Sequence, residues 1–145
     1  MSWMLWKAQL YQESRLDPSA RSPVGAEGLA QFMPATWTDI APRLGYGDAP
    51  RTAVGPAIDA GAYYMAQLRA AWKSERPDID RHYLAMASYN SGLGNIIKAQ
   101  KRCGGAVMYD EIIKCLPDVT GKNSAETMTY VTRIRAYWQR MEAGE

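Results

Sequence analysis

The sequence has few of the side chains on which metal and nucleophile chemistry most often depends. Its 145 residues include one histidine, His82, and two cysteines. One His and two Cys cannot complete a four-ligand zinc site of the usual kind, and triad chemistry would depend on His82 alone. His82 falls in the first turn of a predicted helix, and we expect its side chain to be at the surface. The sequence predicts no metal and no cofactor, and it leaves carboxylates as the main acid–base groups.

Long apolar runs and a strong net charge are also absent. No apolar run reaches the roughly 18 residues that a membrane-spanning helix needs. The formal net charge is +2, which is far from the balance of a dedicated nucleic-acid binder. We therefore expect no transmembrane segment and no nucleic-acid partner. The first seven residues lack the features of a signal peptide, so either a signal has been removed or export takes another route.

Apolar residues recur at helical spacing along most of the chain, and no segment alternates over the length of a strand. The expected helices begin near Trp3, Pro34, Pro56 and Asp80, with short ones over residues 95–102 and 106–115 and a last one capped by Asn123. The helix from Pro56 is expected to bury Ile58, Ala62, Met65, Leu68 and Trp72. Residues 17–31 and 44–55 are glycine- and proline-containing loops. The pattern predicts a mostly α single domain over residues 1–145, with at most a minor β element in the loops.

Glu13 is the acidic residue that stands out. It continues a helical stripe of Trp3, Trp6 and Leu10, so it is expected on the apolar face and near the C-terminal end of the first helix. Burial and the helix dipole both raise the pKa of a carboxyl group in that position. A carboxylic acid that stays protonated near neutral pH suits general acid catalysis. The alternative is a glutamate at a frayed helix end in solvent.

Four short motifs occur in a fixed order around this residue. They are Glu13-Ser14, the segment Gly28-Leu29-Ala30-Gln31-Phe32-Met33-Pro34, the segment Ser88-Tyr89-Asn90-Ser91-Gly92-Leu93-Gly94, and Glu126-Thr127 with Tyr130-Val131. In this register, residues 3–140 resemble the catalytic domain of the soluble lytic transglycosylases, glycoside hydrolase family 23 of the goose-type lysozyme-like superfamily. The resemblance implies a lysozyme-like fold with a substrate cleft. The sequence departs from the family pattern at Ala30, usually Met and here expected to widen the pocket, and at Ser88, usually Ala.

The resemblance also implies roles for individual residues. Glu13 resembles the catalytic acid, and Ser14 the hydroxyl that positions the acid or the substrate's N-acetyl group. The remaining matches are to groups that contact or support the substrate: Gly28, Gln31, Met33, Tyr89, Asn90, Glu126 and Tyr130. Local readings compete with several of them. Ser14 could end a helix, Gly28 could supply a turn, and Gln31 could be a solvated loop residue. Tyr89 and Tyr130 could be core aromatics, Asn90 a helix C-cap, and Glu126 the partner of Asn123 in a capping box.

The activity implied by the resemblance is cleavage of peptidoglycan without a second carboxylate. Glu13 would protonate the oxygen that leaves in the β-1,4 bond between N-acetylmuramic acid and N-acetylglucosamine. It would then take a proton from the muramoyl C6 hydroxyl, which closes a 1,6-anhydro ring. A hydrolytic lysozyme is the alternative, with Asp17, Glu27, Asp39 or Glu126 as its second acid. A non-catalytic glycan-binding module is less favoured, because the set of site residues is intact.

The two cysteines bear on where the protein works. Cys103 and Cys115 are 12 residues apart, and a disulfide between them would stabilise the fold by about 3 kcal/mol in the chain-entropy model. Two buried free thiols are equally consistent with the sequence. The resemblance implies peptidoglycan glycan strands as the partner and action in the periplasm or cell wall. A phage lysis or virion enzyme, a part of a phage particle or larger cell-envelope assembly, and an exported bacterial protein all fit this pattern.

Overall fold

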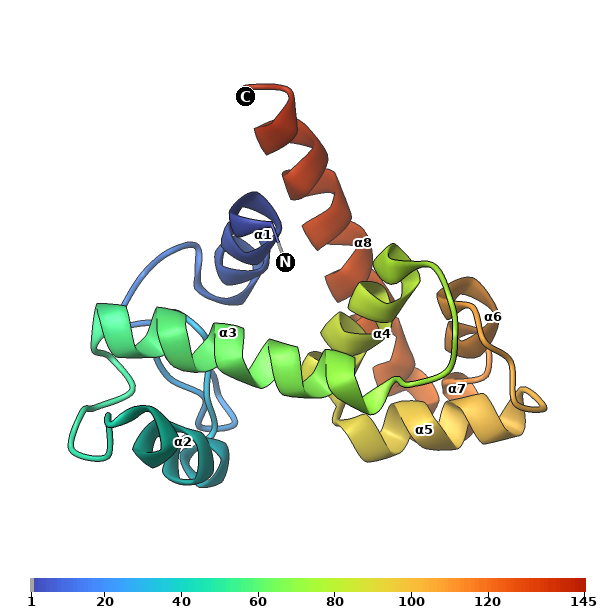
Figure 1. The fold of residues 1–145 in the computed structure, drawn as a ribbon, viewed down its shortest axis with the longest axis horizontal. Helices are drawn as coiled ribbons and strands as arrows, with labels where there is room; N and C mark the ends of the chain where they lie inside the picture. Colours follow the sequence, from blue (N-terminus) through green and yellow to red (C-terminus); the bar gives the residue numbers. More distant parts are fainter. Residues whose placement is uncertain (1) are drawn as a thin grey trace. The chain divides into compact units, whose positions relative to one another are not determined.

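The computed structural model describes residues 2–145, and helices account for most of them (Figure 1). The elements are α1 (Trp3–Ser14), α2 (Pro34–Ile40), η1 (Ala41–Leu44), α3 (Val54–Ala71), α4 (Asp78–Ser91), α5 (Leu93–Arg102), α6 (Tyr109–Ile113), α7 (Pro117–Thr120), η2 (Gly121–Asn123) and α8 (Ser124–Glu142). Isolated antiparallel bridges join Glu27 to Arg21 and to Phe32 in the first glycine-containing loop. The predicted mostly α fold with a minor β element is confirmed.

The chain divides into two compact units. The first unit is Met1–Tyr64 with Ile134–Glu145, and the second is Met65–Arg133. The backbone passes between them inside α3 and again inside α8. The predicted single domain over residues 1–145 stays a prediction. No helix in the described part of the chain is both long enough and apolar enough to cross a membrane.

A tryptophan packed on a glycine organises the core of the first unit. The indole ring of Trp6 from α1 lies directly over Gly61 of α3, where a Cβ atom would overlap the ring. Ala30 lies beside the same contact, and its side chain is fully buried. The expectation that Ala30 widens a pocket is therefore wrong, because its methyl group fills the core next to Trp6. A larger side chain at position 30 would have to displace that ring.

Helix α3 begins at Val54, two residues before the predicted start at Pro56. A proline in the first turn is tolerated because the N–H groups there have no partner within the helix. The buried stripe also differs from the predicted one. Ala57 and Gly61 are buried, whereas Ile58 and Ala62 are only half-buried. Small residues form the buried face of α3 here, so a prediction based on the spacing of large apolar side chains does not find it.

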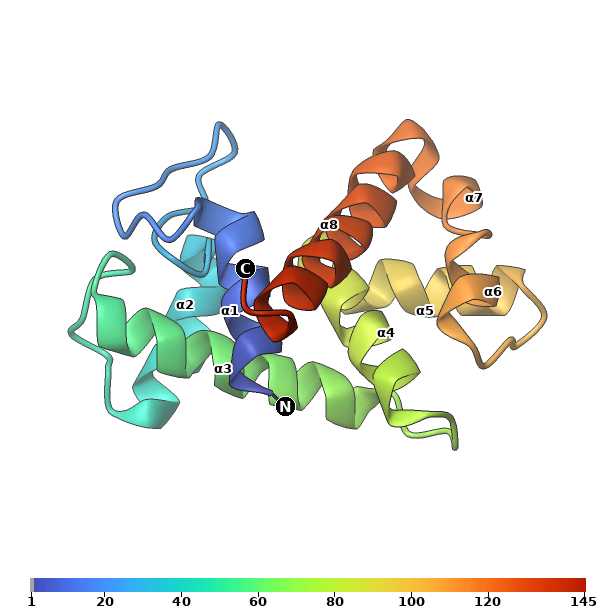
Figure 2. The same ribbon diagram turned by 90° about the horizontal axis from the view of Figure 1, so that it is seen from above.

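In the second unit α5 packs against α4, and α6 and α7 pack against α5 (Figures 1 and 2). The sequence predicted that this helix begins near Asp80, but α4 begins at Asp78, so Asp80 lies inside its first turn. Its carboxylate instead accepts a hydrogen bond from the backbone N–H of Tyr109, at 3.3 Å. Asp80 therefore supports the start of α6 from a neighbouring helix. This is a tertiary contact that local spacing does not reveal.

His82 is buried, and the prediction of a surface histidine is wrong. Its Nδ1 lies 3.2 Å from Nη1 of Arg69. Because the guanidinium can only donate, Nδ1 accepts and the proton of the neutral ring is on Nε2. Among the residues that the structure describes, Nε2 has no hydrogen-bond partner. Burial, and then the neighbouring Arg69 charge, lower the pKa of His82 to about 4.

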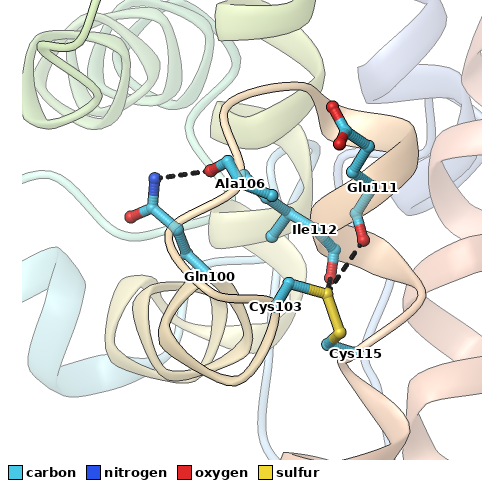
Figure 3. The surroundings of a disulfide bond; sticks show 6 residues. All are labelled: Gln100, Cys103, Ala106, Glu111, Ile112 and Cys115. Atoms are coloured by element: carbon cyan, nitrogen blue, oxygen red, sulfur yellow. Dashed lines mark hydrogen bonds between the residues drawn. A yellow bond between two sulfur atoms is a disulfide. The ribbon is translucent and has the colours of Figure 1, made fainter.

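Cys103 and Cys115 form a disulfide, with their Cα atoms 5.8 Å apart. Figure 3 shows that the bond joins the end of α5 to the turn before α7. Sγ of Cys103 also lies 3.1 Å from the carbonyl oxygen of Glu111. This is a close contact rather than a hydrogen bond, because a disulfide sulfur has no hydrogen to donate.

The helix expected over residues 106–115 is shorter than predicted, since α6 covers only Tyr109–Ile113.

Candidate active site

Glu13 lies in the last turn of α1 and is half-buried. Trp6 and Leu10 of the predicted stripe are buried with it, but Trp3 is 58% exposed, so the apolar face is shorter than predicted. Helix α1 ends immediately after Ser14. Arg15 follows with a left-handed backbone, φ 55°, and donates its N–H to the carbonyl of Tyr11 at 2.8 Å. The predicted acid is therefore held one residue before an abrupt change of chain direction.

Ser14 is buried, and its hydroxyl donates to the carbonyl of Leu10 at 3.1 Å. A serine hydroxyl has one hydrogen and two lone pairs. Since the hydrogen is used inside α1, any contact of Ser14 with another group has to use the lone pairs. The two readings of Ser14, as a helix terminator and as a substrate-positioning group, are thus compatible.

Gln31 is fixed in its loop by its own amide group. The Nε2 atom donates to the carbonyls of Gly28, at 2.8 Å, and Ala20, at 3.1 Å. Only the NH₂ end of the amide can donate to two carbonyls, so this pair of contacts fixes the orientation of the side chain. The Oε1 atom accepts no hydrogen bond from the residues described. Gln31 is therefore anchored by one end and offers an acceptor at the other.

The loop around Gln31 depends on a close approach of two backbone segments. Gly28 has φ +89°, and a Cβ atom there would overlap the carbonyl oxygen of Arg51. The Arg51 side chain then reaches back over the loop and donates to the carbonyls of Gly25 and Phe32, each at 2.7 Å. Arg51 was not among the residues that the sequence predicted for the site. The sequence shows Arg51 only as one long cationic side chain in the predicted loop over residues 44–55, which is otherwise rich in small residues.

Backbone strain gathers at these two places. In the part of the chain that the structure describes, positive φ values at residues other than glycine occur at Arg15, Leu16 and Gln31. The left-handed conformation costs about 1–2 kcal/mol per residue and persists only where the surroundings enforce it. Two of these residues follow the predicted acid, and the third is the predicted substrate-contacting glutamine. Such strain is typical of functional sites.

Met33 and the final motif lie at helix starts. Met33 is the N-cap residue of α2 and is 42% exposed, so its thioether is available for contact. Glu126 lies exposed in the first turn of α8. Asn123 is the last residue of η2 and directly precedes Ser124, the first residue of α8. No side-chain hydrogen bond within the described chain joins Asn123 and Glu126 in a capping box.

In the second unit one hydrogen bond connects two of the motifs. Asn90, in the last turn of α4, accepts a hydrogen bond from the hydroxyl of Thr127 in α8, at 2.8 Å. Thr127 is buried and Asn90 half-buried. Asn90 does not cap α4, since Gly92 is the C-cap and its N–H bonds the carbonyl of Ser88. The sequence motif contains both Glu126 and Thr127, and only Glu126 was predicted as a site residue.

The two predicted tyrosines differ in exposure. Tyr130 of α8 is buried, and Tyr89 of α4 is half-buried. The departure at Ser88 has a structural reason. Its hydroxyl accepts a hydrogen bond from the indole N–H of Trp72 at 3.1 Å and donates to Leu84 at 2.7 Å. An alanine at position 88 would leave a buried indole N–H without this acceptor.

Most of the carboxylates that could act as a second acid already have partners. Asp17 accepts hydrogen bonds from the backbone and hydroxyl of Ser19, at 2.9 and 2.8 Å, and these bonds lower its pKa. Glu27 lies 3.3 Å from Arg21 and 3.8 Å from Arg51. Both carboxylates are thus engaged by partners within the loop structure.

Asp39 pairs with Arg43 one helical turn later, at 2.9 Å, and is exposed. Glu126 makes no ion pair with the residues that the structure describes, and it is exposed. Across residues 2–145, no three acidic, histidine or cysteine side chains group as a metal site would require.

The model of one protein family, the Transglycosylase SLT domain, matches residues 1–110. The chain belongs to this family. The matched region contains Glu13, Gln31, Tyr89 and Asn90 and ends before the last motif. Curated relatives include membrane-bound lytic murein transglycosylase F of Alcanivorax borkumensis and of Serratia proteamaculans. Each is 31% identical over 134 residues, which is 90% of this chain but 27% and 26% of the relatives. This SLT domain thus spans about a quarter of the length of the curated relatives it matches.

Solved structures with the same fold cover the whole chain. The 70 kDa soluble lytic transglycosylase of Escherichia coli superposes with a TM-score of 0.76 at 23% identity, over 100% of this chain and 22% of that one. An inactive mutant of the lytic transglycosylase Slt from Pseudomonas aeruginosa superposes with a TM-score of 0.75 at 27% identity, over 99% and 22%. In that mutant a glutamate is replaced by glutamine. The predicted lysozyme-like fold is confirmed.

Proposed function

We propose that this SLT domain is a peptidoglycan lytic transglycosylase. It cleaves the β-1,4 bond between N-acetylmuramic acid and N-acetylglucosamine and leaves a 1,6-anhydromuramoyl end. The observation that carries this proposal is Glu13, a half-buried carboxyl group inside the region matched by the family and two residues before the left-handed backbone at Arg15. The inactive glutamate-to-glutamine mutant of a relative supports a glutamate as the central group.

Glu13 serves first as acid and then as base. It protonates the glycosidic oxygen, which departs from the muramoyl anomeric carbon and stays on C4 of N-acetylglucosamine as a hydroxyl. The substrate's own N-acetyl group assists at the anomeric carbon. It then accepts the proton of the muramoyl C6 hydroxyl, which attacks that carbon. An internal hydroxyl competes well with water because its effective concentration is high. The partners already held by Asp17, Glu27 and Asp39 favour this course over hydrolysis, which needs a second free carboxylate.

The remaining site residues bind and position the glycan. Gln31 offers Oε1 to an N–H or O–H group of the sugar, because its Nε2 is engaged in the loop. Ser14 offers lone pairs for the same reason. Gly28 keeps the loop in place, and Met33 gives an apolar surface at the start of α2. In the second unit, the proposed glycan-contacting residues are Tyr89 and Asn90 of α4 and Glu126 and Tyr130 of α8.

The mass of the released fragments tests the reaction. Purified sacculi are digested, and the muropeptides are weighed. Anhydromuramoyl ends, lighter than reducing ends by one water, are expected. Reducing ends would instead identify a hydrolytic lysozyme, and no release at all would identify a glycan-binding module.

Action in the periplasm or cell wall follows from this substrate. The disulfide between Cys103 and Cys115 supports a compartment outside the reducing cytosol. Membership of a phage particle or of a larger cell-envelope assembly is a narrower proposal. It predicts that the protein sediments with that particle or assembly, whereas a separately exported enzyme would be recovered alone.

A further inference from the structure

A pocket of about 410 Å³ lies on the second unit, between α5 and α7. Its volume is within the range of small-ligand sites in proteins. The lining residues are Asn95, Lys98, Lys101 and Arg102 from α5, and Asp118 and Val119 from α7. Three of the six side chains are cationic, and one is anionic. None of them belongs to the proposed catalytic set.

The cations of this pocket have no internal partner. Lys98, Lys101 and Arg102 are three and four residues apart, so they share one face of α5, where like charges repel. The helix dipole favours the cations Lys101 and Arg102 in the last turn of α5, but Lys98 lies one turn earlier and gains less from it. No ion pair within the described chain joins any of the three to an acidic side chain, Asp118 included. The excess positive charge is left for a ligand.

The two walls of the pocket are tied together covalently. Cys103 directly follows Arg102, and its disulfide partner Cys115 lies three residues before Asp118 (Figure 3). At the other end of α5 the side chain of Asn95 is fixed by a 2.7 Å hydrogen bond from Nδ2 to the carbonyl of Ser91. A site whose walls cannot separate loses less entropy when a ligand binds.

We propose that this pocket binds the peptide stems of peptidoglycan. The assignment rests on the proposed function, because that function supplies the polymer. A stem peptide carries several carboxylates together with a free amino group, which matches three cations beside Asp118. A phosphate-rich ligand would place only negative charge next to that carboxylate. The overall charge of +2 likewise gives little general attraction for a nucleic acid.

Titration with an isolated stem peptide tests the pocket directly. The probe is the tetrapeptide L-alanyl-D-glutamyl-meso-diaminopimelyl-D-alanine, followed by NMR of the backbone amides. Shifts are expected across residues 95–102 and 118–119, with a dissociation constant of about 1 mM. The double variant Lys98→Glu/Lys101→Glu should bind about tenfold more weakly. The matched variant Lys114→Glu/Lys122→Glu, with exposed lysines elsewhere on the same unit, should bind as wild type.

Two further measurements distinguish a ligand that carries both charges, such as a stem peptide, from a purely anionic ligand such as phosphate. Asp118→Asn should weaken binding, because the ammonium group loses its partner; tighter binding would overturn the assignment of a ligand with both charges. Inorganic phosphate should bind these residues more weakly than the peptide. Equal or stronger phosphate binding, or no peptide-induced shifts at the pocket, would also overturn the proposal.

Cleavage assays distinguish a failure of this inference from a failure of the proposed function. On strands that carry stem peptides, Lys98→Glu/Lys101→Glu should raise KM about tenfold with kcat unchanged. On strands stripped of peptides by an amidase, it should behave as wild type. A wild-type protein that cleaves neither polymer refutes the proposed function, while the peptide titration still decides the pocket. Cleavage of both polymers with the same KM in wild type and variant refutes the pocket alone.

Discussion

The two units position their candidate site residues by different means. In the first unit, backbone groups set the geometry: the turn after Glu13 and the loop around Gln31 are defined by left-handed residues and by bonds to carbonyls. In the second unit, regular helices supply the frame, and one bond between side chains, from Thr127 to Asn90, links α8 to α4.

This difference predicts how each part responds to mutation. A loop built on close backbone contacts and positive φ values tolerates few side chains, so small changes there are costly. A contact between two helical side chains can be removed with little disturbance of either helix. We therefore expect the largest effects in the first unit and the smallest in the Thr127–Asn90 contact.

The strongest test of the first unit is Glu13→Gln. The amide keeps the shape of the side chain but cannot deliver or accept the proton, so turnover of sacculi should fall at least about a thousandfold. The rate is measured by release of muropeptides, and the thermal midpoint should stay close to wild type. Glu75→Gln, a change at an exposed glutamate on the second unit, is the matched control. Near-full turnover by Glu13→Gln would remove the assignment of the acid.

The loop contact is tested by Gly28→Ala beside Gly25→Ala. Both glycines have similar φ values, +89° and +98°, but a Cβ atom overlaps Arg51 at position 28 and meets nothing within 4 Å at position 25. Gly25→Ala should therefore cost about 1 kcal/mol of unfolding free energy from backbone strain, and Gly28→Ala about 3 kcal/mol or more. Denaturant unfolding measures both. Equal losses would show that the approach of Arg51 is not what requires glycine.

In the second unit, His82 should make stability depend on pH. Its pKa is about 4 in the folded protein and near 6.5 when unfolded, so between these values the unfolded chain binds more protons. The contribution of neutral His82 to the free energy of unfolding is fully present above pH 6.5. It is lost as the pH falls towards 4, and the total loss is about 3 kcal/mol. Denaturant unfolding at several pH values should show this loss, and His82→Gln should flatten it. An equally steep profile in the variant would assign the dependence to other groups.

The sequence predicted the helices better than the contacts between them. The spacing of apolar residues predicted α1, α2 and α8 to within a few residues, because a helical face is a local property. It failed for the buried stripe of α3, where Ala57 and Gly61 pack without bulk, and for His82, whose burial depends on neighbouring helices. Distance along the chain does not encode these contacts.

In the candidate site, too, some residues could be predicted from local sequence and others depend on contacts that are distant along the chain. Glu13 and Gln31 were recognisable from motif and spacing, and their roles stay predictions. Arg51 was not recognisable, since it acts through carbonyls 19 and 26 residues away. Thr127 lies inside a motif, but the sequence does not show that its hydroxyl bonds Asn90, 37 residues away. A hydroxyl shows its role only when its partner is known.

The smallest effect is expected where the second unit depends on that hydroxyl. Thr127→Val keeps the shape of the side chain but removes the donor to Asn90, so unfolding free energy should fall by about 1 kcal/mol. Because Asn90 is half-buried, water can replace part of the lost bond, and turnover should fall no more than about tenfold, with the loss in kcat rather than KM. Thr127→Ser, which keeps the hydroxyl, should restore turnover. If serine fails where valine fails, the methyl group matters at this position, and the hydrogen bond does not position Asn90.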